Sequence, residues 1–442
     1  MRIMRHYGRI GWIILVLSTL APGAQSRAEE WKTAWAAPAQ GPFPAGYPTA
    51  QPSLEQAIPD PARGAADQTF RLLVRPDIWG KAVRLRFSNA FGSRPVVIDG
   101  VFVGLQAGAA AVSKGTNHRA TFNFSPEVAI PPGESVWSDG VALPFAAAIG
   151  SELLQGRKLA VSFHVKGESG AITWHAKALT TSYISPPGSG SRGHEEGESN
   201  FPHSTASWYF LDALDVLAPA DTRVIVAFGD SLTDGSSSTI NGDDRWPDAF
   251  SRILHAAYGD RISIVNSGIG GNEVVGPAGY SARKPTAGGP SALERIHRDV
   301  LGLSGVTTVV WLEGINDLAH PERTPEEVLE GFRKGAALIK SRAPDIRIVG
   351  STLTTVLGGT VAGHGAPEQD DKRKRLNRLI GENSPFDALL DFDAVVLDAE
   401  SGKIRKEFVP DSSIGHAGDW VHPNRVGYLR LAESIDVKVL FP

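Results

Sequence analysis

Short runs in which hydrophobic and polar residues alternate dominate the first half of the chain. In the clearest run, Val83-Arg84-Leu85-Arg86-Phe87, the apolar side chains share one face and the arginines the other. This period of two is typical of a half-buried β-strand. Further strand-like runs, bounded by turn residues, lie at 70–74, 83–88, 96–104, 120–124, 159–165 and 174–184. Several short strands separated by turn signals predict a β-sandwich-like domain, which we place at residues 29–220.

From residue 221 onward the pattern changes, and buried strands alternate with helical segments. The strand candidates lie at 224–228, 262–266, 307–312, 346–351 and 394–397, and the helix candidates at 246–258, 292–301, 325–341, 371–382 and 423–435. Thr324-Pro325-Glu326-Glu327 offers an N-cap, a proline at the first helical position and an acid three residues after the cap. This alternation predicts a three-layer, flavodoxin-like α/β fold over residues 221–442, with a parallel sheet covered by helices on both faces.

The first predicted strand of this half ends at a serine. Val224-Ile225-Val226-Ala227-Phe228 runs directly into Gly229-Asp230-Ser231-Leu232, so Ser231 lies at the carboxyl edge, where open α/β sheets bind ligands. A serine attacks a carbonyl only if a nearby base accepts its proton. His422 is the candidate base, and Asp419, three residues earlier, is placed to hold its imidazole. The chain is therefore predicted to be a serine hydrolase.

Two further segments follow predicted strands. The glycine run Asn266-Ser267-Gly268-Ile269-Gly270-Gly271-Asn272 lets a backbone N–H face a substrate oxygen without obstruction by a side chain. In Gly314-Ile315-Asn316-Asp317, the Asn316 amide is either a turn residue or a hydrogen-bond donor to a developing oxyanion. The second glycine of the Gly-x-Ser-x-Gly elbow is absent after Ser231, which argues against an α/β-hydrolase proper.

Other histidines compete for the role of base. Asp317-Leu318-Ala319-His320-Pro321 repeats the spacing between Asp419 and His422, so spacing alone does not separate His320 from His422. His364 and His416 have no acid three residues earlier, and we expect them to flank the site or to lie in solvent.

The four segments, in this order and each after a strand or at a helix start, resemble the sequence blocks of the SGNH hydrolases, also called the GDSL-type esterase and lipase family. The resemblance covers residues 221–440. It implies a nucleophile, a general base and an orienting acid at Ser231, His422 and Asp419. It also implies that the oxyanion donors are the N–H groups of Ser231 and Gly271 and the Asn316 side chain.

The resemblance also bears on three details. Because the family carries its base in the last block, the resemblance favours His422 over His320. Glu313 stands before Gly314, where many members have a small or apolar residue, so the resemblance does not define the local pocket. The β-rich first half, with segments such as Arg75-Pro76-Asp77-Ile78-Trp79-Gly80, is similar to a secreted subgroup close to bacterial xylan-associated esterases.

Composition and charge narrow the function classes. Arg2, Arg5 and Arg9 precede an apolar stretch at 10–20 and Ser26-Arg27-Ala28, which is the pattern of an export signal spanning residues 1–28. The apolar stretch is about half of the ~20 residues that a membrane-spanning helix requires, so we expect no stable membrane anchor after cleavage. Cleavage removes four arginines and no acids, which moves the formal charge from −4 to −8 and argues against nucleic-acid binding. The absence of cysteine excludes thiolate chemistry and suits a periplasmic or secreted protein.

We therefore expect a serine carboxylic-ester hydrolase that requires no metal or organic cofactor. Its expected substrates are short-chain esters, either small molecules or acetylated polysaccharide, because no long apolar lid-like helix lies near the motifs. One alternative is a carbohydrate-binding protein with weak hydrolase activity, which would expose Trp79, Trp137 and Trp174, although burial tendencies favour a core position for them. Another is phosphoester cleavage by Ser231, which the lack of clustered metal ligands disfavours.

Overall fold

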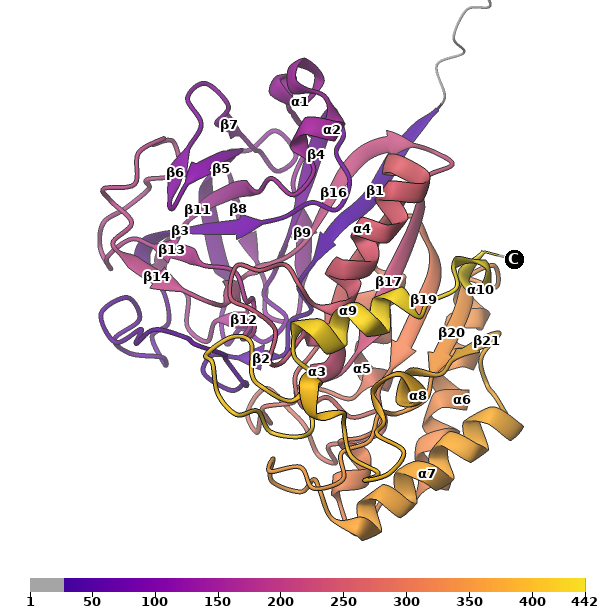
Figure 1. Ribbon diagram of the computed structural model, residues 1–442. Helices are drawn as coiled ribbons and strands as arrows, with labels where there is room; N and C mark the ends of the chain where they lie inside the picture. The colour runs from indigo at the N-terminus through magenta and orange to yellow at the C-terminus, as the bar shows by residue number, and fades with distance from the viewer. Residues whose placement is uncertain (1–27, 442) are drawn as a thin grey trace, which may run out of the picture.

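A five-stranded parallel sheet organises the second half of the chain (Figure 1). The computed structural model describes residues 28–441, so the expected export signal lies outside the described residues except for Ala28. The strands are β17 (Arg223–Gly229), β18 (Ile262–Gly268), β19 (Val306–Leu312), β20 (Arg347–Ser351) and β21 (Ala388–Leu390), in the order β18-β17-β19-β20-β21. Counted from β17, this is the order 2-1-3-4-5 of flavodoxin-like sheets, and the predicted α/β fold is confirmed for this half.

Helices cover both faces of the sheet, because successive side chains along each strand point into two different cores. Val224, Val226 and Phe228 of β17 pack with one set of helices, whereas Ile225 and Ala227 pack with the other set. The first set is α5 (Ala292–Ile296), α6 (Pro325–Arg342) and α7 (Pro367–Glu382), and the second is α4 (Trp246–Tyr258), α8 (Phe392–Val396) and α9 (Arg425–Glu433).

The predicted helix start at Thr324 is confirmed. The Thr324 hydroxyl accepts a hydrogen bond from the Glu327 N–H at 3.2 Å, and the Glu327 carboxylate accepts one from the Thr324 N–H at 2.9 Å. The remaining helical segments of this half are short: α3 (Ser231–Asp234), η1 (Gly259–Arg261), η2 (His297–Leu301), η3 (Asp317–Ala319), η4 (Lys406–Phe408) and α10 (Val437–Leu440).

Antiparallel sheets make up the first half of the chain. One sheet has the order β1-β16-β4-β10, with β9 also paired to β4, and consists of β1 (Glu29–Ala36), β16 (Leu211–Pro219), β4 (Ala82–Ser88), β10 (Val141–Ala142) and β9 (Ser135–Trp137). The second has the order β14-β13-β3-β11-β5-β6, with β7 and β8 paired to β5. Its strands are β14 (His203–Thr205), β13 (Ser182–Ile184), β3 (Ala66–Val74), β11 (Leu159–Glu168), β5 (Val96–Gly108), β6 (Ala111–Val112), β7 (His118–Arg119) and β8 (Glu127–Ile130).

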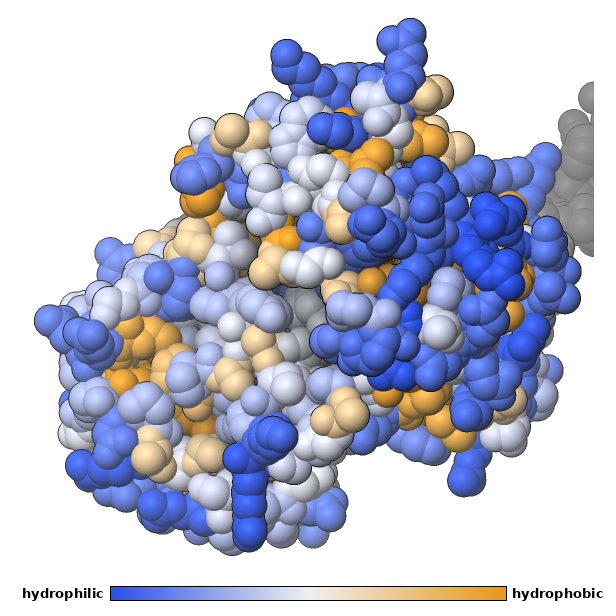
Figure 2. All heavy atoms as spheres, turned by 90° about the horizontal axis from the view of Figure 1, so that it is seen from below, coloured by the Kyte–Doolittle hydropathy of each residue, from blue (hydrophilic) through white to orange (hydrophobic). Residues whose placement is uncertain are grey.

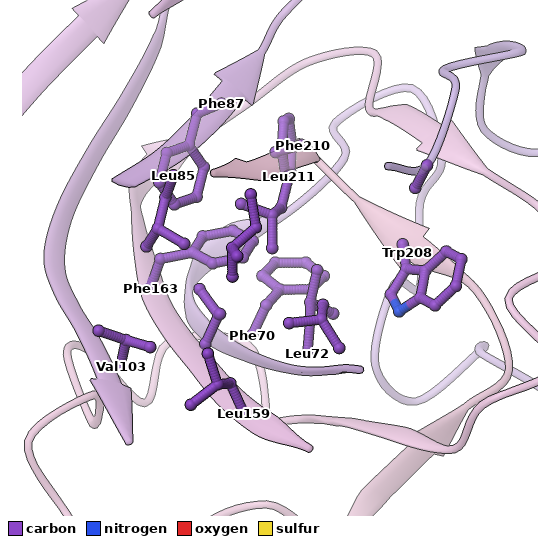
Figure 3. Packing of buried hydrophobic residues seen from close by; sticks show 14 of the residues in the cluster. Phe70, Leu72, Leu85, Phe87, Val103, Leu159, Phe163, Trp208, Phe210 and Leu211 are labelled. Atoms are coloured by element: carbon purple, nitrogen blue, oxygen red, sulfur yellow. The ribbon is translucent and has the colours of Figure 1, made fainter. Parts of the chain in front are cut away.

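The two sheets share one hydrophobic core, as Figure 3 shows. Phe87 of β4 packs against Phe163 of β11, and Phe163 stacks on Phe70 of β3 with the ring centroids 5.5 Å apart. A third small sheet accompanies them, formed by β15 (Trp208–Tyr209), β12 (Thr173–His175) and β2 (Gly41–Pro42), together with the short helices α1 (Pro144–Ile149) and α2 (Ser151–Leu154). The predicted β-sandwich-like arrangement is therefore confirmed only in part.

Three predicted strands are wrong in detail. Residues 120–124 form no strand, because Asn123 and Phe124 take positive φ angles of 49° and 64° in a tight turn. The run at 174–184 is divided into β12 and β13 by an irregular segment. The run at 394–397 lies mostly in helix α8, because the Asp391 side chain caps that helix at the Ala394 N–H, and the fifth strand is instead Ala388–Leu390.

Strand β1 of the first half lies against β18, the outer strand of the parallel sheet. The Ser263 hydroxyl of β18 donates to the Thr33 carbonyl of β1 at 2.8 Å. The Ile264 N–H of the same strand donates to the Asp77 carboxylate at 2.7 Å. Because core residues Ala36 and Ala213 also pack with the parallel sheet, the boundary between residues 220 and 221 stays a prediction.

The tryptophans of the first half lie largely inside the protein. Trp79 and Trp174 are buried, and half-buried Trp137 lies beside the guanidinium groups of Arg84 and Arg86. The core position expected for Trp79 and Trp174 is therefore confirmed. None of the helices within residues 28–441 combines the length and apolar character needed to cross a bilayer.

Candidate active site

Ser231 stands directly after strand β17, at the start of the short helix α3 (Figure 1). Gly229 permits this tight exit from the strand, because a Cβ atom there would lie 2.1 Å from the Leu312 carbonyl oxygen of neighbouring β19. The Asp230 carboxylate then accepts a hydrogen bond from the Leu232 N–H at 3.0 Å and caps α3. These contacts place Ser231 at the carboxyl edge of the sheet.

The structure brings Ser231, His422 and Asp419 into one hydrogen-bonded series. The His422 Nε2 lies 2.8 Å from the Ser231 Oγ, and the His422 Nδ1 lies 2.6 Å from an Asp419 carboxylate oxygen. The second Asp419 oxygen accepts the N–H groups of His422 and Val421 at 2.8 and 2.9 Å. Asp419 is thus fixed by its own turn while it orients the imidazole.

The protonation of this series follows from its contacts. Burial acts to raise the pKa of the Asp419 carboxyl, but the hydrogen bond and charge of His422 outweigh it, so this pKa lies well below its ordinary value. An ionised Asp419 accepts a hydrogen bond from the Nδ1–H of His422. The ring proton is therefore on Nδ1, and Nε2 is free to accept the Ser231 hydroxyl proton. The geometry suits a serine whose proton is removed by histidine.

Ser231, Gly271 and Asn316 all line one cavity of about 650 Å³. Gly271 has a φ angle of 77°, and a Cβ atom there would lie 2.5 Å from the Tyr47 ring, so only glycine fits. The Asn316 amide donates one hydrogen bond to the Asn272 carbonyl at 2.9 Å. Within residues 28–441, no acceptor engages its other amide hydrogen or the N–H groups of Ser231 and Gly271. These are the three donors that the sequence predicted.

The rival pair Asp317 and His320 is not assembled. The Asp317 carboxylate accepts the N–H groups of Val274 and Val275 at 2.7 and 3.0 Å, whereas His320 contacts Glu273 at 3.2 Å. His320 nevertheless lines the same cavity as Ser231. The identical Asp-x-x-His spacing therefore forms a hydrogen-bonded pair at residues 419–422 and none at residues 317–320.

The other two candidate histidines, His364 and His416, differ in their distance from the cavity. His364 lines the cavity beside Asn316, so the expectation that it flanks the site is confirmed. His416 is exposed.

Glu313 does not line the cavity. It is buried in the core and accepts the Trp311 indole N–H at 2.7 Å, and burial raises its pKa to about 7. Across residues 28–441, no group of three or more His, Cys, Asp or Glu side chains is placed to hold a metal ion.

The first half of the chain contributes residues that the sequence analysis missed. Tyr47 and Lys177 line the cavity, and the Lys177 ammonium donates to the Ser236 hydroxyl, while burial lowers the pKa of Lys177. His175 contacts the Asp234 carboxylate at 3.1 Å, and the other oxygen of Asp234 accepts the Gly270 N–H at 2.8 Å. No motif or period in the sequence marks these residues, because contacts between segments distant along the chain bring them to the site.

Comparison with known proteins concerns the second half of the chain. Residues 227–430 match the model of the GDSL-like lipase/acylhydrolase family. No curated protein sequence matches the chain. A carbohydrate acetylesterase from Sinorhizobium meliloti is similar in structure, with 18% identity, 49% of this chain and 98% of that chain covered, and a TM-score of 0.37. A GDSL-like lipase from Bacteroides thetaiotaomicron has 17% identity, 50% and 88% coverage and a TM-score of 0.35. An aryl esterase from M. smegmatis has 15% identity and a TM-score of 0.36, and the comparison covers 48% of this chain and 95% of that chain.

Proposed function

We propose that this protein, whose residues 227–430 match the model of the GDSL-like lipase/acylhydrolase family, is a serine esterase that cleaves short-chain carboxylic esters through an acyl-enzyme. The observation that carries the proposal is the hydrogen-bonded series of Asp419, His422 and Ser231 beside a cavity. Ser231, Gly271 and Asn316 line the same cavity, and each has an N–H hydrogen that no acceptor within residues 28–441 engages. These free donors support the stabilisation of a negatively charged oxygen.

The proposed reaction assigns a role to each residue of the site. The Ser231 oxygen attacks the ester carbonyl while His422 Nε2 accepts the hydroxyl proton, and Asp419 stabilises the imidazolium. The N–H groups of Ser231 and Gly271 and the Asn316 amide hold the tetrahedral oxyanion. His422 then returns the proton to the departing alcohol. Water hydrolyses the acyl-enzyme by the same path, with no metal or organic cofactor in any step.

Replacement of the Asn316 amide tests the proposed oxyanion site. Asn316→Ala should lower kcat by roughly 10²–10³ and change KM little, because the charge on the carbonyl oxygen develops mainly in the transition state. Asn316→Asp should be at least as damaging, since it places a carboxylate oxygen opposite the oxyanion. Steady-state kinetics with p-nitrophenyl acetate measure both effects. A rise in KM alone would make Asn316 a ground-state binder and would remove it from the oxyanion site.

The cavity wall combines polar and apolar side chains around Ser231. Lys177, Glu273 and His320 place charged or polar groups in its wall, and the Tyr47 ring, 54% exposed, lies at Gly271. Figure 2 views the molecule from the side toward which the parallel strands run, and apolar residues form small separate groups on that face. An exposed ring beside hydrogen-bonding groups suits stacking on a sugar. We therefore infer that acetylated carbohydrate is a substrate class.

A substrate panel tests this choice of ester. Activity should fall from p-nitrophenyl acetate to dodecanoate, because Lys177, Glu273 and His320 interrupt the apolar surface of the cavity wall on which a long acyl chain would lie. Acetate release from acetylated xylan should be detectable, and Tyr47→Ala should raise KM for xylan more than for p-nitrophenyl acetate. A preference for dodecanoyl over acetyl esters would refute the short-chain proposal. Equal KM changes on both substrates would remove Tyr47 from sugar recognition.

We also propose export to the periplasm or the medium. The proposal rests on the basic, apolar and small-residue pattern of residues 1–28 and on the absence of cysteine.

A further inference from the structure

His364 is held between two amide side chains. Its Nε2 atom lies 3.2 Å from the Asn316 Oδ1, and its Nδ1 atom lies 2.7 Å from the Gln369 Nε2. Gln369 is buried in the first turn of α7, and its Oε1 accepts the Gly365 N–H at 3.1 Å. The loop that carries His364 therefore joins α7 to the proposed oxyanion site.

These contacts determine where the His364 proton lies. Because the Gly365 N–H fixes the Gln369 oxygen, the Gln369 nitrogen faces His364, and an amide nitrogen only donates. Nδ1 of His364 must then be an acceptor, so the ring proton of the neutral imidazole is on Nε2. That Nε2–H donates to the Asn316 oxygen.

The Asn316 amide is oriented in turn. With its oxygen engaged by His364, its nitrogen faces the Asn272 carbonyl at 2.9 Å and keeps a second hydrogen for the cavity. The reversed amide would place the Asn316 oxygen next to the Asn272 carbonyl oxygen and opposite the oxyanion. Both placements are repulsive, so the orientation of this amide matters to the reaction.

We propose that His364, held by Gln369, is a positioning residue that keeps the Asn316 amide nitrogen directed at the developing oxyanion. This inference rests on the proposed esterase function. It goes beyond the Asp419–His422–Ser231 series, because His364 acts on the oxyanion donor and not on the nucleophile. The histidine in this role must keep a proton on Nε2, and because Gln369 donates to Nδ1 the ring of the wild-type protein is neutral.

The surroundings of His364 favour the neutral form. Burial, together with the nearby His422, lowers the pKa of His364 to about 4, although the charge of Asp419 acts in the opposite direction. The remaining titratable neighbour, His320, also acts to lower this pKa. His364 is therefore neutral above about pH 5, and the arrangement around Asn316 is unchanged over the working range of an esterase.

A double-mutant cycle tests the coupling of His364 to Asn316. His364→Ala should lower kcat by roughly 10–100-fold with little change in KM, a smaller loss than that of Asn316→Ala. His364→Gln, which keeps a donor for the Asn316 oxygen, should recover most of the activity. In an Asn316→Ala background, His364→Ala should have no further effect, because the group it positions is gone. Multiplying losses in the double variant would refute the proposal, as would a His364→Gln enzyme no better than His364→Ala.

Gln369→Glu supplies a pH-dependent test. A carboxylate facing Nδ1 only accepts, so it would raise the pKa of His364 and keep a proton on Nδ1. Below that pKa the imidazolium still donates from Nε2 to Asn316. Above it, Nε2 loses its proton, the Asn316 amide reverses, and kcat should fall as pH rises. The wild-type enzyme should show no such decline above pH 5. If kcat of Gln369→Glu did not fall as pH rises, the proposed positioning of Asn316 by His364 would be contradicted.

Nitrogen NMR of His364 gives a readout that does not require activity. In Ser231→Ala protein, His364 should be the neutral Nε2–H form down to about pH 5, consistent with a pKa near 4. An Nδ1–H form, or a protonated ring at pH 7, would overturn the inference even if the esterase proposal holds. If the wild type hydrolyses no ester, the proposed function fails while the NMR result still decides how His364 is held.

Discussion

Ser231→Ala is expected to abolish ester hydrolysis and leave the protein folded. The change removes the attacking oxygen and a single hydrogen bond to His422, whereas the strand exit at Gly229 and the Asp230 cap remain. We expect kcat for p-nitrophenyl acetate to fall by roughly 10⁴–10⁶-fold. Circular dichroism and the thermal midpoint should match those of the wild type, since the site lies on the strand edge and not in the core.

A fluorophosphonate probe makes the same test without a substrate. The wild type should be labelled and Ser231→Ala should not, because the probe reacts only with an activated serine. Ser341→Ala, at an exposed position of α6, serves as the matched control and should label fully. Full labelling of Ser231→Ala would exclude Ser231 as the nucleophile.

His422→Ala is expected to cost several orders of magnitude in kcat, because Nε2 of His422 is the atom placed to accept the Ser231 proton at 2.8 Å. Asp419→Asn or Asp419→Ala should cost less, since an imidazole that is not oriented retains some basicity. The pH profile of kcat/KM, compared between the variants, measures the loss of the base.

His320→Ala is the comparison that decides between the two histidines. His320 contacts Glu273 in the cavity wall and has no hydrogen bond to Asp317, so its loss should act on substrate binding and leave most of kcat. A His320→Ala enzyme as inactive as His422→Ala would undermine the assignment of the base.

The part of the site that the sequence predicted lies where local pattern and chemistry coincide. Ser231 and the glycine run directly follow buried strands, and Asn316 follows one after a short turn, so the shared edge of a parallel sheet brings them together. Spacing alone did not separate His320 from His422, because both follow an aspartate by three residues, and His422 was favoured only by the family resemblance. Only the structure shows that the Asp317 carboxylate accepts hydrogen bonds from the N–H groups of Val274 and Val275 and does not orient His320.

The residues that the sequence did not predict are held by contacts distant along the chain. Lys177 and Tyr47 belong to the first half, and nothing in their own segments marks them as part of a cavity built around Ser231. The fifth strand was misplaced because the apolar run at 394–397 also satisfies a helix, and the cap at Asp391 decides for the helix. Tertiary packing therefore decides the position of Lys177 and Tyr47, whereas helix capping decides the structure of residues 394–396.

The contacts of β1 and Asp77 with β18 cover the outer strand of the parallel sheet. An outer strand presents unpaired N–H and C=O groups that readily pair with a strand from another molecule. Here the Asp77 carboxylate accepts the Ile264 N–H, and β1 packs along β18, where its Thr33 carbonyl accepts the Ser263 hydroxyl. A fragment that began at residue 221 would retain Ser231, His422 and Asp419 but would leave this strand bare. We therefore expect such a fragment to aggregate more readily than the whole chain, for a reason separate from any contact that the first half makes with substrate.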